Sequence, residues 1–515
     1  MSSVLSILEV SQKQAYIFAG NELKGNVDRS EEIAWVTSPA YFTGQVPDSG
    51  YQPENLVYAG GGHTVLEFSN HEAAVRFNEK VTARIMADFP EMEVFAKIED
   101  YDEGKKPSEN LKNLIAALEV KKSVRRASFH QGTFGLEKID SNTLEPVAKK
   151  DASEKEGKKT ELQPSLTPAG YQHVYKFGDL GGSRESSNFI AVVHIDGNGM
   201  GKRVEDFYAS IDSLPWPEFK KRVAEFSEEI DVDFKAAFKE MNEEVAWNLE
   251  HGELKEELSL RGKNFPVRRI ITSGDDICFV TEGRIGIECA RIFVEKLCAK
   301  KNKVDGQGYA ACAGVAIVHQ KYPFYRAYDL AEKLCSNAKS FGAMLSTEDN
   351  GRAVSSIDWH IEFGEIPDSI GELRAAYKTS DAKHLELRPY IIHAPEEILK
   401  KEPSRQYKNF RSVYDVITSK SKAYARSSVK QLRMALKNSE DTVRQYITFH
   451  KLDGLLTDCY KGIFTETDTS KVGSGVVTEN RIFLKTADGE DRSFLFDAIE
   501  IMDTFVPLAG KEAAE

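Results

Sequence analysis

The chain has 515 residues, of which 41% are hydrophobic and 29% charged, a composition typical of globular proteins with several domains. Its formal net charge of −13 argues against a protein that coats nucleic acid without specificity, because such binding depends on neutralising phosphates. No apolar run of about 18 residues exists to span a bilayer, and the start MSSVLSILEVSQK lacks signal-peptide features, so we expect a cytoplasmic protein without a membrane partner.

The first half of the chain is predicted to form strands and helices, with a glycine-rich turn in the central hairpin. We expect a strand at VLSILEV, a helix at QKQAYIFAGNELKG, a hairpin at NLVYAGGGHTVLEFS, a helix at HEAAVRFNEKVTARIMADF and a strand at EMEVFAKIE. Residues 140–170 follow, a polar stretch rich in Lys, Glu, Ser and Pro that is typical of a linker or a disordered insertion. We therefore place a first domain at residues 1–139.

The second half repeats this order. The expected elements are a buried strand (189–196), helices (about 204–258), a hairpin at RRIITSGDDICFVTE, a helix at RIGIECARIFVEKLCAK, a strand (309–319) and a helix from Pro323 to near Gly342. This is a split-βαβ, ferredoxin-like order, which we assign to residues 171–355. The fold class predicted is α+β, with two such domains and a mainly helical domain at 356–515.

The two hairpins, VYAGGGHTVLEF and IITSGDDICFV, can be laid over each other. Gly61, Gly62 and His63 then lie opposite Gly274, Asp275 and Asp276, in the same order. We interpret this as an internal duplication in which one copy carries an acid pair and the other does not.

The acid pair, Asp275 and Asp276, places two like charges in a tight turn between apolar strands, which raises the pKa of both unless a cation compensates. Asp196 ends the first strand of the same domain and would lie beside them. Three carboxylates so placed suit a pair of divalent ions about 4 Å apart for phosphoryl transfer, with Mg²⁺ or Mn²⁺ as the cofactor. We therefore assign catalytic and metal-binding roles to these three residues. The competing interpretation is an exposed hairpin tip, where acids are common.

Several residues around the acids suit a nucleotide. Gly197, Asn198 and Gly199 follow Asp196 directly and would let the backbone bend around a phosphate, although a simple strand-to-helix turn explains the glycines equally well. Ser273 and Gly274 would leave room for a base or ribose. The alternative is that a tight hairpin turn simply requires small residues at these positions. A final candidate is a helix-terminal lysine, Lys339, which could bind triphosphate or complement the helix dipole.

Together, FIAVVHIDGNGMG, SGDD and CAGVAIVHQKYPFYRAYDLAEKLCSNAKSFG resemble the catalytic palm of the large polymerase-cyclase subunit of type III CRISPR effector complexes, a family related to GGDEF cyclases. VSQKQAYIFAGNELKGNV and YAGGGHTVLEF resemble its degenerate first palm. The resemblance implies synthesis of cyclic oligoadenylate messengers from ATP in antiviral defence. It also implies a triphosphate contact for Lys339, a nucleotide-binding or scaffold role for Gly61 and Gly62, and guide RNA and effector subunits as partners.

Some family features have no counterpart here. No His-Asp dipeptide occurs, so we expect no DNase activity from a nuclease domain. No cysteine precedes Cys278, so a zinc site between the palms is not expected either, and the six cysteines, scattered without a C-x-x-C pair, are expected to be core thiols. Ser273 stands where the family's GGDD motif has glycine. The residues do not decide between a ribonucleoprotein subunit and an enzyme acting alone or as a dimer.

Two alternatives to the cyclase remain open. One is a catalytically silent nucleotide- or RNA-binding scaffold. It is suggested by residues 400–437, a segment that contains eleven Lys or Arg but only two acidic residues, with tyrosines interspersed. A solvated helix face explains the same pattern. The other alternative, a diguanylate-type cyclase, is disfavoured because Ile277 stands where such enzymes have glutamate.

Overall fold

The computed structural model describes residues 3–124, 166–182, 188–252, 254–347, 351–362, 364, 369–419, 424–452, 454–463 and 481–510, excepting the side chains of 273 and 461–463. Most of the expected linker, 140–165, lies outside the described residues. The strands are β1 (Val4–Val10), β2 (Leu56–Gly60), β3 (His63–Phe68), β4 (Val94–Asp100), β5 (Phe189–Gly197), β6 (Val267–Ser273), β7 (Asp276–Glu282), β8 (Ala311–His319), β9 (Ser355–Ile361), β10 (Tyr390–His393), β11 (Phe483–Lys485) and β12 (Asp491–Ser493).

The longer connections between these strands are mostly helical. The helices are α1 (Lys13–Ile17), α2 (Leu23–Val36), α3 (Pro39–Gln45), α4 (His71–Asp88), α5 (Pro107–Ser123), α6 (Met200–Ile211), α7 (Trp216–His251), α8 (Leu254–Glu257), α9 (Gly286–Cys298), α10 (Phe324–Leu345), α11 (Ile370–Ala375), α12 (Glu396–Lys401), α13 (Tyr407–Thr418), α14 (Arg426–Asn438), α15 (Glu440–Phe449), α16 (Leu455–Ile463) and α17 (Phe496–Glu500).

Two sheets share one strand order. The first sheet runs β2-β3-β1-β4, and the second contains the matching series β6-β7-β5-β8. Every pair in both series is antiparallel, as a split-βαβ unit requires. The α+β fold with two palm-type sheets is therefore confirmed.

The second sheet continues beyond residue 355, where we expected the second palm to end. β9 pairs parallel with β8, and β10 pairs with β9, so both add to the palm sheet. All seven residues of β9 are buried, which fits a strand covered on both faces. The domain limits drawn from the sequence remain a prediction.

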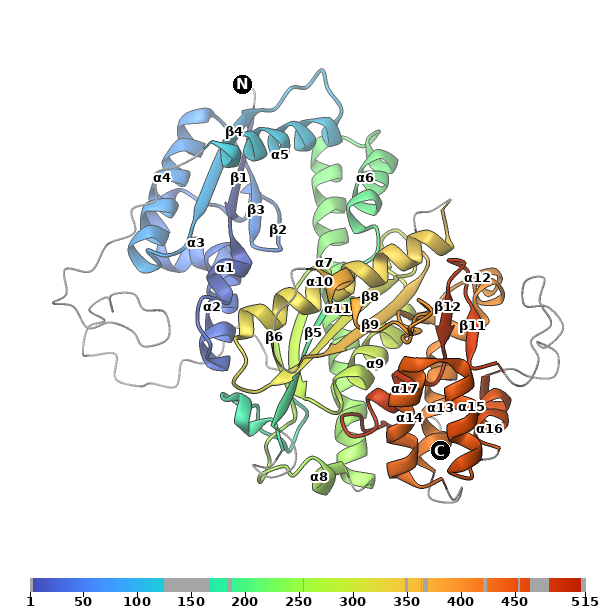
Figure 1. The fold of residues 1–515 in the computed structure, drawn as a ribbon. Coiled ribbons are helices and arrows are strands. Elements are labelled where there is room, and N and C mark those ends of the chain that lie inside the picture. Colours follow the sequence, from blue (N-terminus) through green and yellow to red (C-terminus); the bar gives the residue numbers. More distant parts are fainter. Residues whose placement is uncertain are drawn as a thin grey trace.

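One long helix connects the two palms. α7 has 36 residues and runs from the first palm along the second in Figure 1. Its amino-terminal part packs Phe219 and Val223 against the first sheet, in one core with Leu5 and Ile7. Its later turns, from Phe226 onward, belong to the core of the second palm. The two palms thus pack against one continuous helix.

Opposite faces of the second sheet are covered by different helices. α7 and α9 pack on the face that contains Val193 and Ile195, whereas α10 packs on the face that contains Ile190 and Val192. The first palm reaches this second face through α1 and α2, and it shares one core with α10. The residues at this contact come from both halves of the sequence.

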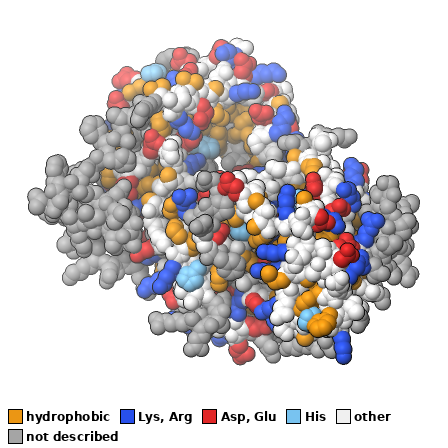
Figure 2. Space-filling view, viewed as in Figure 1, with side chains coloured by type: hydrophobic (Ala, Val, Ile, Leu, Met, Phe, Trp, Pro, Cys, Tyr) orange, Lys and Arg blue, Asp and Glu red, His pale blue; other side chains and the backbone are white. Residues whose placement is uncertain are grey.

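The C-terminal helices lie beside the second palm (Figure 1), with a small hairpin of β11 and β12. Figure 2 shows Lys and Arg side chains over this region among apolar and acidic ones. Part of the basic segment 400–437 is used within the protein: Arg405 is buried over the ring of Phe341, and Arg426 and Lys430 pair with Asp503. Within the described residues, no helix has the length and apolar character needed to cross a membrane.

Candidate active site

The acid residues meet where β5 ends and β7 begins. β7 pairs with β5 so that Asp276 lies directly opposite Asp196. Ser273 pairs with Asp276 across the β6–β7 hairpin, which leaves Gly274 and Asp275 as the turn. Gly274 has φ 64°, a left-handed conformation that glycine adopts without strain. The sequence therefore brings all three carboxylates to one edge of the sheet, as expected.

The turn is held close to the end of β5 by a glycine. The backbone N–H of Gly197 donates to the carbonyl of Asp275 at 3.3 Å. A Cβ added to Gly197 would lie 3.0 Å from Cβ of Asp275, tighter than ordinary packing permits. Gly197 thus allows Asp275 to pack against the residue that follows Asp196.

Lys339 extends from α10 to the same place. Its Nζ lies 2.6 Å from Oδ2 of Asp196 and donates to the carbonyl of Gly197 at 3.0 Å. Burial opposes the charge of this lysine, but the Asp196 carboxylate outweighs burial, and the pKa of Lys339 is raised. The lysine is therefore held protonated beside the carboxylates.

Burial and mutual repulsion act on the other two acids. Burial, followed by the negative charge of Asp196, raises the pKa of Asp275 to about 6. Burial, followed by the charges of Asp196 and Asp275, raises the pKa of Asp276 to about 7. Such shifts mark a place where added positive charge is favourable.

The chemistry of these donors suits a divalent cation. The carboxylates offer hard oxygen atoms of the kind that Mg²⁺ prefers, and buried Oδ1 of Asp276 accepts no hydrogen bond within the described part of the chain. Nδ1 of His194 lies 3.5 Å from this oxygen, but burial lowers the pKa of that histidine to about 4, so it supplies no charge. Across the described residues, no three or more His, Cys, Asp or Glu side chains form a group that could hold a metal ion.

The remaining predicted site residues surround this edge. Asn198 donates its side-chain amide to the carbonyl of Val354 at 2.7 Å, so it fixes the turn after β5. Gly199 has φ 63° and precedes α6. Space around Gly274 is open, since an added Cβ would meet nothing within 4 Å. The side chain of Ser273 lies outside the described atoms.

The first palm has matching positions. Glu9 lies opposite His63 in the β1–β3 register, as Asp196 lies opposite Asp276 in the second palm. Lys122 of α5 pairs with Glu9 at 2.9 Å, as Lys339 pairs with Asp196.

The sequence reasoning missed Lys122, although its position is a usable signal. It lies 15 residues into α5 (107 to 122), the same offset as Lys339 in α10 (324 to 339).

Lys13 interacts with both the β2–β3 hairpin of the first palm and the β6–β7 hairpin of the second. Its Nζ donates to the carbonyl of Gly61, and its side chain packs against Gly62. Burial lowers the pKa of Lys13, while the charges of Glu9 and Asp276 both raise it. Lys13 thus contacts the glycine turn of the first palm and also interacts with the charge of Asp276 in the second, and it is a second residue that the sequence reasoning missed.

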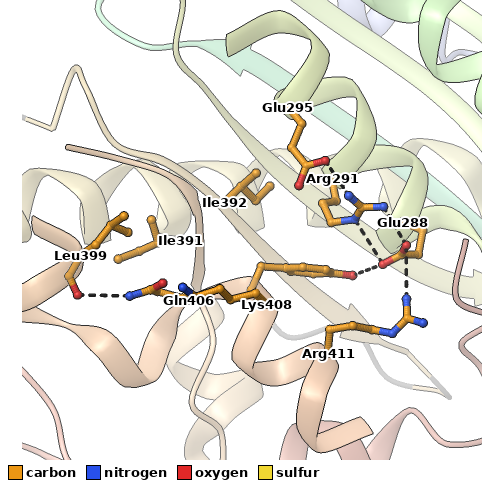
Figure 3. Close-up of a pocket in the computed structure, with 10 residues that line it drawn as sticks. Glu288, Arg291, Glu295, Ile391, Ile392, Leu399, Gln406, Lys408 and Arg411 are labelled. Atoms are coloured by element: carbon orange, nitrogen blue, oxygen red, sulfur yellow. Dashed lines mark hydrogen bonds and ion pairs between the residues drawn. The ribbon is translucent and has the colours of Figure 1, made fainter. Parts of the chain in front are cut away.

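A separate cavity of about 430 Å³ lies at the contact between the second palm and the C-terminal helices (Figure 3). Its lining includes none of the three acids. Buried Glu288 accepts from the hydroxyl of Tyr407 at 2.6 Å and from Arg291 at 2.9 Å, and Arg411 also points toward it. Because these charges are paired internally, the cavity is part of the interdomain contact rather than of the acid site.

Comparison with known families agrees with this geometry. Residues 189–344 match the family model described as Cas10/Cmr2, second palm domain. This region is similar to the second palm of Cas10-type proteins. The match confirms the resemblance inferred from the sequence, and it covers β5, β6, β7, β8 and nearly all of α10. No curated protein sequence matches the chain.

Solved structures share the fold of the Cas10-like chain at low sequence identity. A Csm1–Csm4 cassette in complex with cA4 has a TM-score of 0.54 at 16% identity, and one in complex with AMPPNP has 0.54 at 17%. Csm1 in T. onnurineus has 0.52 at 16%. In each case 98% of this chain and 70% of the other are covered. An apo cassette has 0.51 at 16%, covering 88% of this chain but 65% of the other.

Proposed function

We propose that the protein is a Mg²⁺-dependent nucleotidyltransferase that makes cyclic oligoadenylates from ATP in CRISPR-type defence. The observation that carries this proposal is the convergence of Asp196, Asp275 and Asp276 at one sheet edge, next to Lys339. The Cas10-type palm match and the solved cassettes with cA4 and AMPPNP support the substrate class. Guide RNA and effector subunits are the proposed partners.

In the proposed reaction, a 3′-hydroxyl attacks the α-phosphate of ATP, a new P–O bond forms, and pyrophosphate leaves. Asp196 and Asp275 would hold the divalent ions, with Asp276 beside them. When bound, such ions neutralise charge on the attacking and leaving oxygens. Lys339, held by Asp196, would contact the triphosphate.

Gly274 leaves room for a nucleotide, whereas side chains of the protein pack against Gly197 and Gly199. The backbone of Gly197 and Gly199 would lie against the phosphates, and the open space at Gly274 would admit the base or ribose. In the first palm, Gly61 and Gly62 would bind the acceptor nucleotide, because Lys13 contacts both glycines and also interacts with the charge of Asp276.

The test is incubation of the purified protein with labelled ATP and Mg²⁺, with and without guide and target RNA, followed by mass spectrometry. We expect cyclic products from the wild type and a loss of at least about 100-fold in Asp275→Asn, because removing a preorganised charged group from such a site costs that much. The matched control is Asp329→Asn, an exposed aspartate of α10 that pairs with Lys333 and should leave synthesis unchanged.

Absence of product under all these conditions would contradict the proposal. If Asp275→Asn and Asp276→Asn also left nucleotide binding unchanged, while RNA affinity depended on residues 400–437, the protein would instead be a scaffold that binds RNA without chemistry.

A further inference from the structure

A second cation, Arg352, lies at the turn that follows β5. Its side chain packs on Gly199: a Cβ added to that glycine would lie 2.7 Å from Cγ and 3.0 Å from Nε of Arg352. Since Gly199 has no Cβ, the stem of the arginine rests directly on the backbone of the turn. Lys339 contacts the same turn two residues earlier, at the carbonyl of Gly197.

The backbone that carries Arg352 is fixed on both sides. Gly351, at φ 74°, lies so close to the end of α10 that an added Cβ would be 2.4 Å from N of Ala343. Val354 is fully buried, and its carbonyl accepts from the side chain of Asn198 at 2.7 Å. The position of Arg352 is therefore set by α10 and by the turn after Asp196.

The guanidinium of Arg352 is weakly engaged. Its NH1 lies 3.8 Å from Oδ2 of Asp206, longer than the 2.7–2.9 Å of a charge-assisted hydrogen bond. The side chains of Arg352 and Asp206 are 36% and 45% exposed, so water screens the pair. Asp206 is also bound by Lys202 at 2.8 Å. Among the described residues, the guanidinium donors of Arg352 thus remain available to a stronger anion.

We propose that Arg352 binds the terminal phosphates of the nucleoside triphosphate whose α-phosphate lies at the three carboxylates. The inference rests on the proposed function, because it assumes a triphosphate beside Asp196. Lys339 and Arg352 would hold the phosphates from two different elements, α10 and the loop before β9. Arginine suits this task because its planar donors match phosphate oxygens two at a time.

The experiment compares binding of AMPPNP and of AMP, each with Mg²⁺, to the wild type, Arg352→Ala and Arg352→Lys. We expect Arg352→Ala to weaken AMPPNP binding about tenfold, the usual effect of losing a charged hydrogen bond, and to leave AMP binding unchanged. Arg352→Lys should bind AMPPNP with an affinity between those of the wild type and Arg352→Ala. Lys202→Ala is the matched control, since it removes the other cation bound to Asp206 and should keep AMPPNP affinity.

The outcomes separate the two proposals. Unchanged AMPPNP binding in Arg352→Ala, or an equal loss for AMP and AMPPNP, would overturn the assignment of Arg352. A wild type that binds AMPPNP with the expected dependence on Arg352, but makes no product from ATP, would overturn the proposed reaction and leave this assignment standing. A wild type that binds neither nucleotide would overturn both.

Discussion

Asp276 and His63 occupy matching positions at the ends of the two hairpins, and burial acts on them in opposite directions. It raises the pKa of Asp276 to about 7 and lowers the pKa of His63 to about 4, so each is driven toward its neutral form. Asp276, however, also faces Asp196 and Asp275, whose repulsion a cation can relieve. The second palm therefore contains a repulsion between carboxylates that added positive charge would relieve.

The lowered pKa of His63 makes stability depend on pH. Because its folded pKa, about 4, lies below the ordinary 6.5, the unfolded chain binds more protons between these values. The folded protein therefore keeps its full stability above pH 6.5, and it loses the part that depends on neutral His63 as the pH falls toward 4. We expect the wild type to lose about 2 kcal/mol more than His63→Gln in urea unfolding between pH 7.5 and 4.5.

The matched control for His63 is His71→Gln, at an exposed histidine of α4 in the same palm. This variant should retain the pH dependence of the wild type. If His63→Gln and the wild type lost equal stability between the two pH values, the histidine would not be held neutral by the fold.

At the scale of elements, local patterns predicted the strands and α4 of the first palm and the centre of the second palm, but not α3, α5 or most of α2. Apolar runs indicated β1, β5 and β8, and the glycines at 60–62 and 274 indicated both hairpin turns. β9 and β10 were not predicted as part of the sheet. The pairing of β9 with β8 is parallel and follows the crossover helix α10, so it depends on a tertiary contact that no local pattern encodes.

The contact between α10 and β8 positions Lys339, and it depends on Gly314. A Cβ added there would lie 1.9 Å from the carbonyl oxygen of Ala331 and 2.4 Å from N of Cys335, both backbone atoms of α10. Gly314→Ala should therefore force the helix away from the sheet. We expect a loss of about 2–3 kcal/mol in the free energy of unfolding, together with weaker AMPPNP binding.

Gly25→Ala in α2 is the control for Gly314→Ala. The new Cβ would meet Cβ of Glu22 at 3.9 Å, an ordinary contact, and alanine is favoured over glycine within a helix. Equal stability of Gly25→Ala and Gly314→Ala in urea unfolding would show that α10 can adjust without cost.

At the scale of the whole molecule, the site depends on packing between the palms that the sequence could not predict. The sequence predicted a helix at QKQAYIFAGNELKG, but no local pattern shows that α1 and α2 pack against α10 and β6. Glu31 of α2 pairs with Arg269 of β6 at 3.2 Å, and both are buried. For the same reason, Lys13 could not be assigned from the sequence to the neighbourhood of Asp276.

Phe18 should couple the stability of the first palm to that of the second, because it packs against α10. It is buried, with its ring centroid 4.3 Å from that of Tyr328 and 5.5 Å from that of Phe324, both on α10. We expect Phe18→Ala to destabilise the protein by about 3–5 kcal/mol and to speed hydrogen exchange in α10 as well as in α1. The control is Phe449→Ala, at a ring that is 82% exposed and should have no effect. Faster exchange confined to α1 would mean that the palms fold independently, and that α10 keeps Lys339 in place without the first palm.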